Sequence, residues 1–182
     1  LVGLLQERLK ALVWLSEGAP LRRADAAEAL DRLGWTPGDL HTFIEVPGAG
    51  VWIGKYPVTN SQYARFVEAE DFAKPEYWQA FPRFGEPPAY EEIGDWGDEG
   101  WEWLQSNLRK KGDSPNRKRV YPRYWEDARF GKARSSAPVV GVTWYEANAY
   151  CCWLQEHWEG QPESRENRGL KPRAVRLPLE CE

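Results

Sequence analysis

Two helix starts of the same kind, 84 residues apart, constrain this chain more than any other feature. Thr59 is followed three residues later by Gln62, and Thr143 by Glu146. This is the spacing of a capping box, in which each side chain satisfies a free backbone N–H at the start of a helix. Each box is followed by apolar residues at helical spacing: Tyr63, Phe66 and Val67 after the first, and Ala147, Tyr150, Trp153 and Leu154 after the second.

Short β-type segments precede both helix starts. Residues 43–46 and 51–53 flank a Pro47-Gly48 turn, so they predict a β-hairpin that leads into the first helix. Residues 138–142 are strand-like and lead into the second helix, and residues 174–178 read as another short strand. Two strand-to-helix units therefore enclose a long middle segment.

Residues 1–34 predict a helical pair, which we call the leader. The first helix has an apolar face of Leu5, Leu9, Leu12 and Val13, and it is expected to end at Glu17-Gly18. The second helix has an apolar face of Ala26, Leu30 and Leu33. Pro20 is expected to open the connection, and Gly34 to end the second helix. So short a pair cannot bury both faces alone, so it should pack on the following domain, on a partner or on a preceding region. Residues 1–40 are thus a helical leader and linker, and 41–182 a second unit.

The middle segment, residues 70–137, is expected to be an irregular charged insertion. Residues 86–102 contain seven acidic and no basic residues, whereas residues 107–134 contain ten basic and three acidic ones. A basic patch for an anionic partner is one interpretation. The other, which we favour, is a solvated insertion whose two halves attract weakly, because the acidic block offsets the field of the basic one. The basic tract from Arg165 to Arg176 is interpreted in the same way.

Composition excludes several classes of protein. A net charge of −4 argues against nucleic-acid binding, and no apolar run is long enough to span a membrane. Three cysteines without a CxxC pair predict a reducing, cytoplasmic location rather than a disulfide framework. With His41 and His157 as the only imidazoles, no His-rich metal centre is expected. The 11 Trp residues are interpreted as packing rings rather than as a ligand-stacking surface.

Two long motifs carry a family resemblance. Residues 51–66 read VWIGKYPVTNSQYARF, and residues 138–154 read PVVGVTWYEANAYCCWL. Both resemble hallmark segments of the formylglycine-generating enzyme (sulfatase-modifying factor) family, as does VRLPLECE at residues 175–182, although Leu179 and Cys181 depart from the usual Thr and Ala. The resemblance covers roughly residues 43–182 apart from the insertion.

The resemblance implies a loop-rich α+β domain related to the C-type lectin fold, of which this chain is the N-terminal part. The motif residues themselves have structural chemistry: caps, strand-edge prolines and core rings. They are Pro57, Thr59, Asn60, Tyr63, Thr143, Trp144, Tyr150 and Trp153. No catalytic, cofactor-binding or metal-binding residue is transferred to this chain, and Cys151 matches a family position outside the active site.

The resemblance leaves three functions open. A copper-dependent oxidase that converts a sulfatase cysteine to formylglycine would need a cysteine pair, and calcium or copper, in a C-terminal part beyond Glu182. An iron-dependent carbon–sulfur bond-forming enzyme would need three histidines on the helical domain, and the leader has none. The favoured interpretation is a non-catalytic display scaffold. Bacterial proteins of this kind include the variable proteins of diversity-generating retroelements.

The favoured reading also specifies partners. A protein or peptide ligand would bind the C-terminal segment beyond Glu182. The C-terminal half of the same domain, also beyond Glu182, would complete the core. With no Met anywhere in the sequence, the chain is expected to start inside a longer gene product. No membrane partner is expected.

Overall fold

The computed structural model describes residues 2–14, 20–79, 102–106 and 120–179. The elements are α1 (Val2–Trp14), α2 (Pro20–Arg32), β1 (Phe43–Val46), β2 (Val51–Gly54), α3 (Asn60–Glu68), α4 (Pro75–Gln79), α6 (Trp144–Glu156), a 3₁₀ turn η1 (Trp158–Gly160) and α7 (Pro162–Glu166). Residues 102–106 are also helical. Helices and a small sheet together give a mixed α+β domain, as expected. The acidic block, apart from Glu102, and residues 107–119 of the basic tract lie outside the described residues.

Both predicted capping boxes are confirmed. Thr59 is the N-cap of α3, and its hydroxyl accepts a hydrogen bond from the Gln62 backbone N–H, while the Gln62 side chain accepts one from the Thr59 N–H. Thr143 and Glu146 repeat the arrangement at α6, with the Glu146 carboxylate 2.6 Å from the Thr143 nitrogen. Each box satisfies two backbone donors that a helix start otherwise leaves free.

Removing a cap is expected to have a measurable but moderate cost. Thr143→Ala should lower the free energy of unfolding by about 1 kcal/mol, because the Glu146 N–H loses its acceptor. Urea unfolding of the purified protein would measure it, with Thr143→Ser, which keeps the hydroxyl, and exposed Thr36→Ala as controls. Equal stability of Thr143→Ala and Thr36→Ala would contradict this role.

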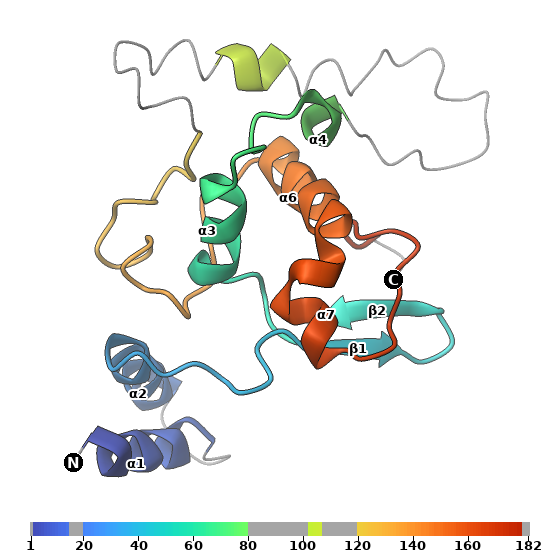
Figure 1. The fold of residues 1–182 in the computed structure, drawn as a ribbon. Coiled ribbons are helices and arrows are strands. Elements are labelled where there is room, and N and C mark those ends of the chain that lie inside the picture. Colours follow the sequence, from blue (N-terminus) through green and yellow to red (C-terminus); the bar gives the residue numbers. More distant parts are fainter. Residues whose placement is uncertain (1, 15–19, 80–101, 107–119, 180–182) are drawn as a thin grey trace.

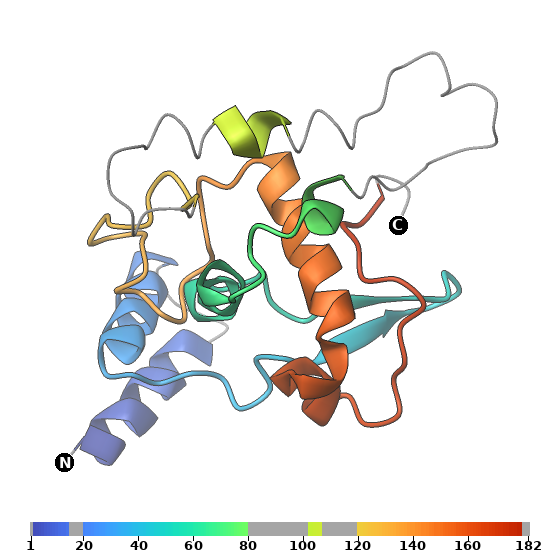
Figure 2. The same ribbon diagram turned by 45° about the horizontal axis from the view of Figure 1, so that its top comes forward.

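The core lies between α3 and α6, which lie next to each other at the centre of the molecule (Figures 1 and 2). Phe66 on α3 is 0% exposed, and Trp153 on α6 is 3% exposed. Their ring centroids lie 5.8 Å apart, and Tyr63 stacks on Tyr150 at 5.5 Å. Other buried members of this cluster come from α4 and from the segments on either side of the two helices: Phe72, Tyr77, Trp78, Leu104, Val120, Trp125 and Trp158. The many aromatic residues thus serve mainly in packing.

The predicted hairpin forms, but the other two strand predictions are wrong. β1 and β2 pair antiparallel, with Ile44 opposite Ile53 and Val46 opposite Val51. Before α6, residues 138–142 are extended but form a single bridge, Thr59 to Pro138, and residues 174–178 form no strand. A strand needs a partner along its length, and each of these segments has the local pattern of a strand without such a partner in the described residues.

A buried acid on α2 joins the leader to the rest of the domain. Asp31 on α2 accepts hydrogen bonds from Arg134 Nε at 2.5 Å and from the Ser136 N–H at 2.7 Å. Ala26 and Leu30 are buried beside it, as predicted, whereas α1 has no buried residue. Pro20 is the first residue of α2 rather than part of the connection, a favourable place because a first-turn residue needs no N–H donor. Gly34 follows α2 with a φ of 70°, which suits glycine at a helix end.

No helix among the described residues is long and apolar enough to cross a membrane. The leader and the hairpin lie on opposite sides of the two central helices (Figures 1 and 2). The C-terminal segment runs back from α7 along the hairpin side.

Candidate functional site

A cavity of about 830 Å³ lies between the hairpin, the C-terminal half of α6 and residues 170–178. We call it the hairpin cavity. Its walls are mostly apolar and aromatic, and they include Phe43, Trp52, Ile53, Leu154 and Trp158. The volume and the lining are those of a small-molecule or side-chain pocket. Trp52 remains 47% exposed, so part of this apolar lining is open to solvent.

The wall of the hairpin cavity also contains a buried charged cluster. Glu163, at the start of α7, is 1% exposed and accepts hydrogen bonds from the Arg65 guanidinium on α3. The His41 ring nitrogen Nδ1 lies 3.0 Å from the same carboxylate, and Gln62 Nε2 lies 3.3 Å away. We call His41, Gln62, Arg65 and Glu163 the Glu163 cluster. It joins the segment before β1 to α3 and α7.

The environment of Glu163 keeps its carboxylate ionised. Burial raises the pKa of a carboxyl group, but the hydrogen bonds from His41 and Arg65 and the charge of Arg65 outweigh it and lower the pKa of Glu163 to about 2. The cluster is therefore a fixed, satisfied charge network, and it presents oriented polar groups to an otherwise apolar cavity.

The rim of the hairpin cavity is cationic. Lys171, Arg173 and Arg176 line it from the C-terminal segment, and Lys55 lines it from the end of the hairpin. Lys55 pairs with Asp39, whereas Lys171 and Arg173 have no ion-pair partner among the described residues. Among the described residues, Glu163 is the acid that lines the cavity, and it is already paired with Arg65. The field at the entrance therefore favours negatively charged groups.

Most of the motif residues are buried. Tyr63, Tyr150 and Trp153 are buried in the core, and Thr59 is a buried cap. Asn60 is 1% exposed, and its side-chain nitrogen lies within 3.0 Å of the carbonyl oxygens of Phe130, Gly131 and Arg134. It thereby holds the loop before Pro138 against α3. Pro57 and Tyr150 also line the hairpin cavity.

The expectation that Trp144 is a core ring is wrong. Trp144 is the first residue of α6 and is 41% exposed, and its ring meets that of Tyr145 edge to face at 5.6 Å. The helical stripe of α6 starts at Glu146 and continues through Ala149, Tyr150 and Trp153, which places residue 144 outside the buried face. Trp144 was predicted to be buried because it is apolar, but its position around the α6 axis decides its exposure.

The two described cysteines are packing residues. Cys151 is buried and Cys152 is half-buried on α6, and both are free thiols. Burial raises the pKa of Cys151 to about 12 and that of Cys152 to about 11, so both thiols stay protonated near neutral pH. Cys181 lies outside the described residues.

The Glu163 cluster was not predicted from the sequence. His41 was considered only as an imidazole ligand, and neither Glu163 nor Arg65 was assigned a role. Two weak signals were present: Arg65 interrupts the apolar stripe of α3, and Glu163 follows Pro162 at the start of a short helix, where an acid is favoured. Neither signal shows that the residues meet, because they are 98 positions apart.

The fold and cavity define a loop-rich α+β domain built on two capped helices, with an apolar pocket at one end of its core. A comparison with known families matches residues 5–182 to the sulfatase-modifying factor enzyme 1-like domain. The chain therefore belongs to this family. The match includes the leader, and so extends beyond the residues that carry the motifs.

One curated relative is a much longer protein. A stretch of 114 residues is 25% identical to serine/threonine-protein kinase Pkn1 of Chlamydia trachomatis serovar L2 (strain ATCC VR-902B / DSM 19102 / 434/Bu). It covers 63% of this chain but only 13% of the kinase. No solved structure matches the chain.

Proposed function

We propose that this domain is a non-catalytic ligand-binding scaffold, related to the C-type lectin fold and diversified as the variable protein of a retroelement. The observation that carries the proposal is the hairpin cavity, an apolar pocket with exposed Trp52 in its lining. Ordered polar groups of the Glu163 cluster in one wall would fix the orientation of a ligand. The ligand is a protein or peptide, and further contacts come from polypeptide beyond residue 182.

The chemistry of the cavity favours one kind of peptide. Exposed Trp52 favours an apolar or aromatic side chain, because burying such a surface gives most of the free energy of a small interface. Lys171 and Arg173 at the rim favour acidic residues beside it. The proposed ligand is therefore an acidic peptide segment with at least one large apolar residue.

The similarity to part of the chlamydial kinase is consistent with a binding role. The protein that carries the similar stretch is named as a serine/threonine-protein kinase, and this stretch is a small fraction of its length. A segment of this kind thus occurs within a protein whose named activity is different from cysteine oxidation. A binding module fits that arrangement, because such modules are combined with many activities.

Selection from a displayed random-peptide library tests the proposal. Peptides enriched on the purified full-length protein should combine acidic residues with large apolar ones. Trp52→Ala should weaken the binding of a synthesised enriched peptide by about 10- to 30-fold, as expected for a central aromatic contact. Higher salt should also weaken it.

Trp144→Ala is the matched control, because Trp144 is similarly exposed but does not line the cavity. It should leave peptide affinity unchanged. Equal affinity of the Trp52 and Trp144 variants, or enrichment of peptides without acidic residues, would contradict the proposed site. Copper-dependent conversion of a cysteine-containing sulfatase peptide to its formylglycine form, detected by mass spectrometry, would overturn the non-catalytic proposal.

A further inference from the structure

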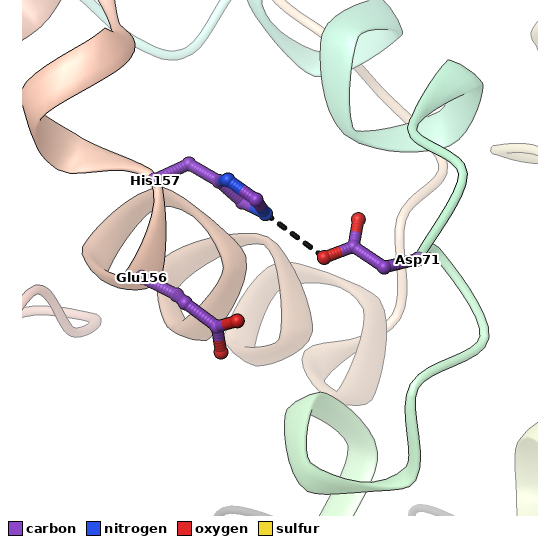
Figure 3. Close-up of side chains that lie close together, drawn as sticks. All are labelled: Asp71, Glu156 and His157. Carbon is purple, nitrogen blue, oxygen red and sulfur yellow. Dashed lines mark hydrogen bonds and ion pairs between the residues drawn. The ribbon is translucent and has the colours of Figure 1, made fainter.

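We propose that Asp71, Glu156 and His157 form a binding site for a zinc-class divalent cation at the C-terminal end of α6. We call these residues the α6 cluster. One ligand atom from each residue lies within 4.8 Å of the others. Figure 3 shows His157 and Asp71 pointing toward each other, with the Glu156 carboxylate beside them on the same helix as His157.

The cluster is assembled by the fold rather than by local sequence. Asp71 lies in the turn between α3 and α4, whereas Glu156 and His157 end α6, about 85 positions later. Contacts between α4 and α6, with the Tyr77 hydroxyl 3.4 Å from His157 Nε2, bring the two segments together. No metal residue was predicted from the sequence, because two histidines are too few for a His-rich centre.

The donor set suits zinc better than calcium or magnesium. One imidazole and two carboxylates are typical zinc ligands, whereas calcium and magnesium prefer oxygen alone. The His157 Nε2 atom lies 2.9 Å from Asp71 Oδ2. Two ligands of a tetrahedral zinc ion lie about 3.3 Å apart, so this pair is close to coordination geometry. The longer Glu156 side chain would close the remaining distance by a change of rotamer.

Neighbouring side chains already orient two of the three ligands. The Tyr77 hydroxyl donates a hydrogen bond of 2.6 Å to Asp71, and the Trp153 ring lies 5.4 Å from the His157 ring. Outer contacts of this kind hold metal ligands in place in known sites.

A cation already neutralises the third ligand. The Lys74 ammonium group lies 2.7 Å from both carboxylate oxygens of Glu156. A bound metal ion would take the place of this ammonium group at Glu156. Lys74 is therefore a competitor of the metal, and its removal should strengthen metal binding.

Titration of the purified full-length protein with zinc, by calorimetry and by thermal unfolding, tests the site. The wild-type protein should bind zinc and unfold at a higher temperature with it. Asp71→Asn and His157→Ala should each weaken binding at least about tenfold, whereas Lys74→Gln should tighten it about threefold or more. Cobalt(II) should give visible absorption bands that are lost in the same two ligand variants.

His41→Ala is the matched control, since His41 is the other histidine of the chain and lies in the Glu163 cluster. It should leave zinc affinity unchanged. Circular dichroism would establish that each variant is folded, and Asp71→Asn supplies a test that does not depend on the His157 variant. No zinc binding by the wild-type protein, unchanged affinity in both ligand variants, or weaker binding by Lys74→Gln would overturn the proposal.

Discussion

Replacing Phe66 by alanine is expected to lower the free energy of unfolding by about 3–5 kcal/mol. Phe66 is 0% exposed, and its ring contacts five other aromatic rings. These rings belong to Tyr63, Phe72, Trp78, Tyr150 and Trp153. The substitution would leave a cavity at the point where α3, α4 and α6 meet, and rigid rings around it relax only partly. Urea unfolding monitored by Trp fluorescence would measure the loss.

Trp144→Ala is the control for the Phe66 variant. It removes a larger ring, but that ring is 41% exposed, so the expected loss is about 1 kcal/mol or less. The order of the two losses is therefore set by burial and not by side-chain size. A greater loss for Trp144→Ala than for Phe66→Ala would show that the core is located elsewhere.

Replacing Arg65 by alanine is expected to cost about 3 kcal/mol of stability, because it leaves the buried Glu163 carboxylate without its main counter-ion. Arg65 also donates a hydrogen bond to Gln161, which would be lost. The double variant Arg65→Ala/Glu163→Gln should recover much of the loss, since it removes the unpaired charge as well. Arg65→Lys tests whether charge alone is sufficient without the forked geometry.

The same pair predicts a pH dependence. The pKa of Glu163 is lowered from an ordinary value of 4.5 to about 2 in the folded protein, so its contribution to stability is fully present above pH 4.5. That contribution is lost as the pH falls from 4.5 through about 2. The stability difference between wild type and Glu163→Gln, measured by urea unfolding, should therefore shrink across this range. A difference that is constant with pH would contradict the assigned ion pair.

The sequence predicted the parts of the fold that depend on local chemistry. A capping box is formed within four residues, so Thr59 and Thr143 could be identified without knowledge of the partner segments. The hairpin was predicted for the same reason, because its turn and its alternating strands are adjacent. The family resemblance then related these elements to one domain.

Features that depend on distant contacts were missed or wrong. Residues 138–142 and 174–178 have strand-like composition, but pairing decides whether a strand forms. Trp144 was placed in the core on apolar character, although its position at the start of α6 turns it outward. The Glu163 cluster and the α6 cluster each join residues that are more than 80 positions apart. Contacts between such distant residues cannot be predicted from the local pattern of one sequence.

The central claim is that α3 and α6 are two halves of one aromatic core. A double-mutant cycle between Phe66 and Trp153, with each replaced by leucine and unfolding measured in urea, tests it most directly. The rings are in contact across the two helices, so we expect a coupling free energy of about 1 kcal/mol. Additive losses, with a coupling of about 0.3 kcal/mol or less, would show that the two helices do not share a core.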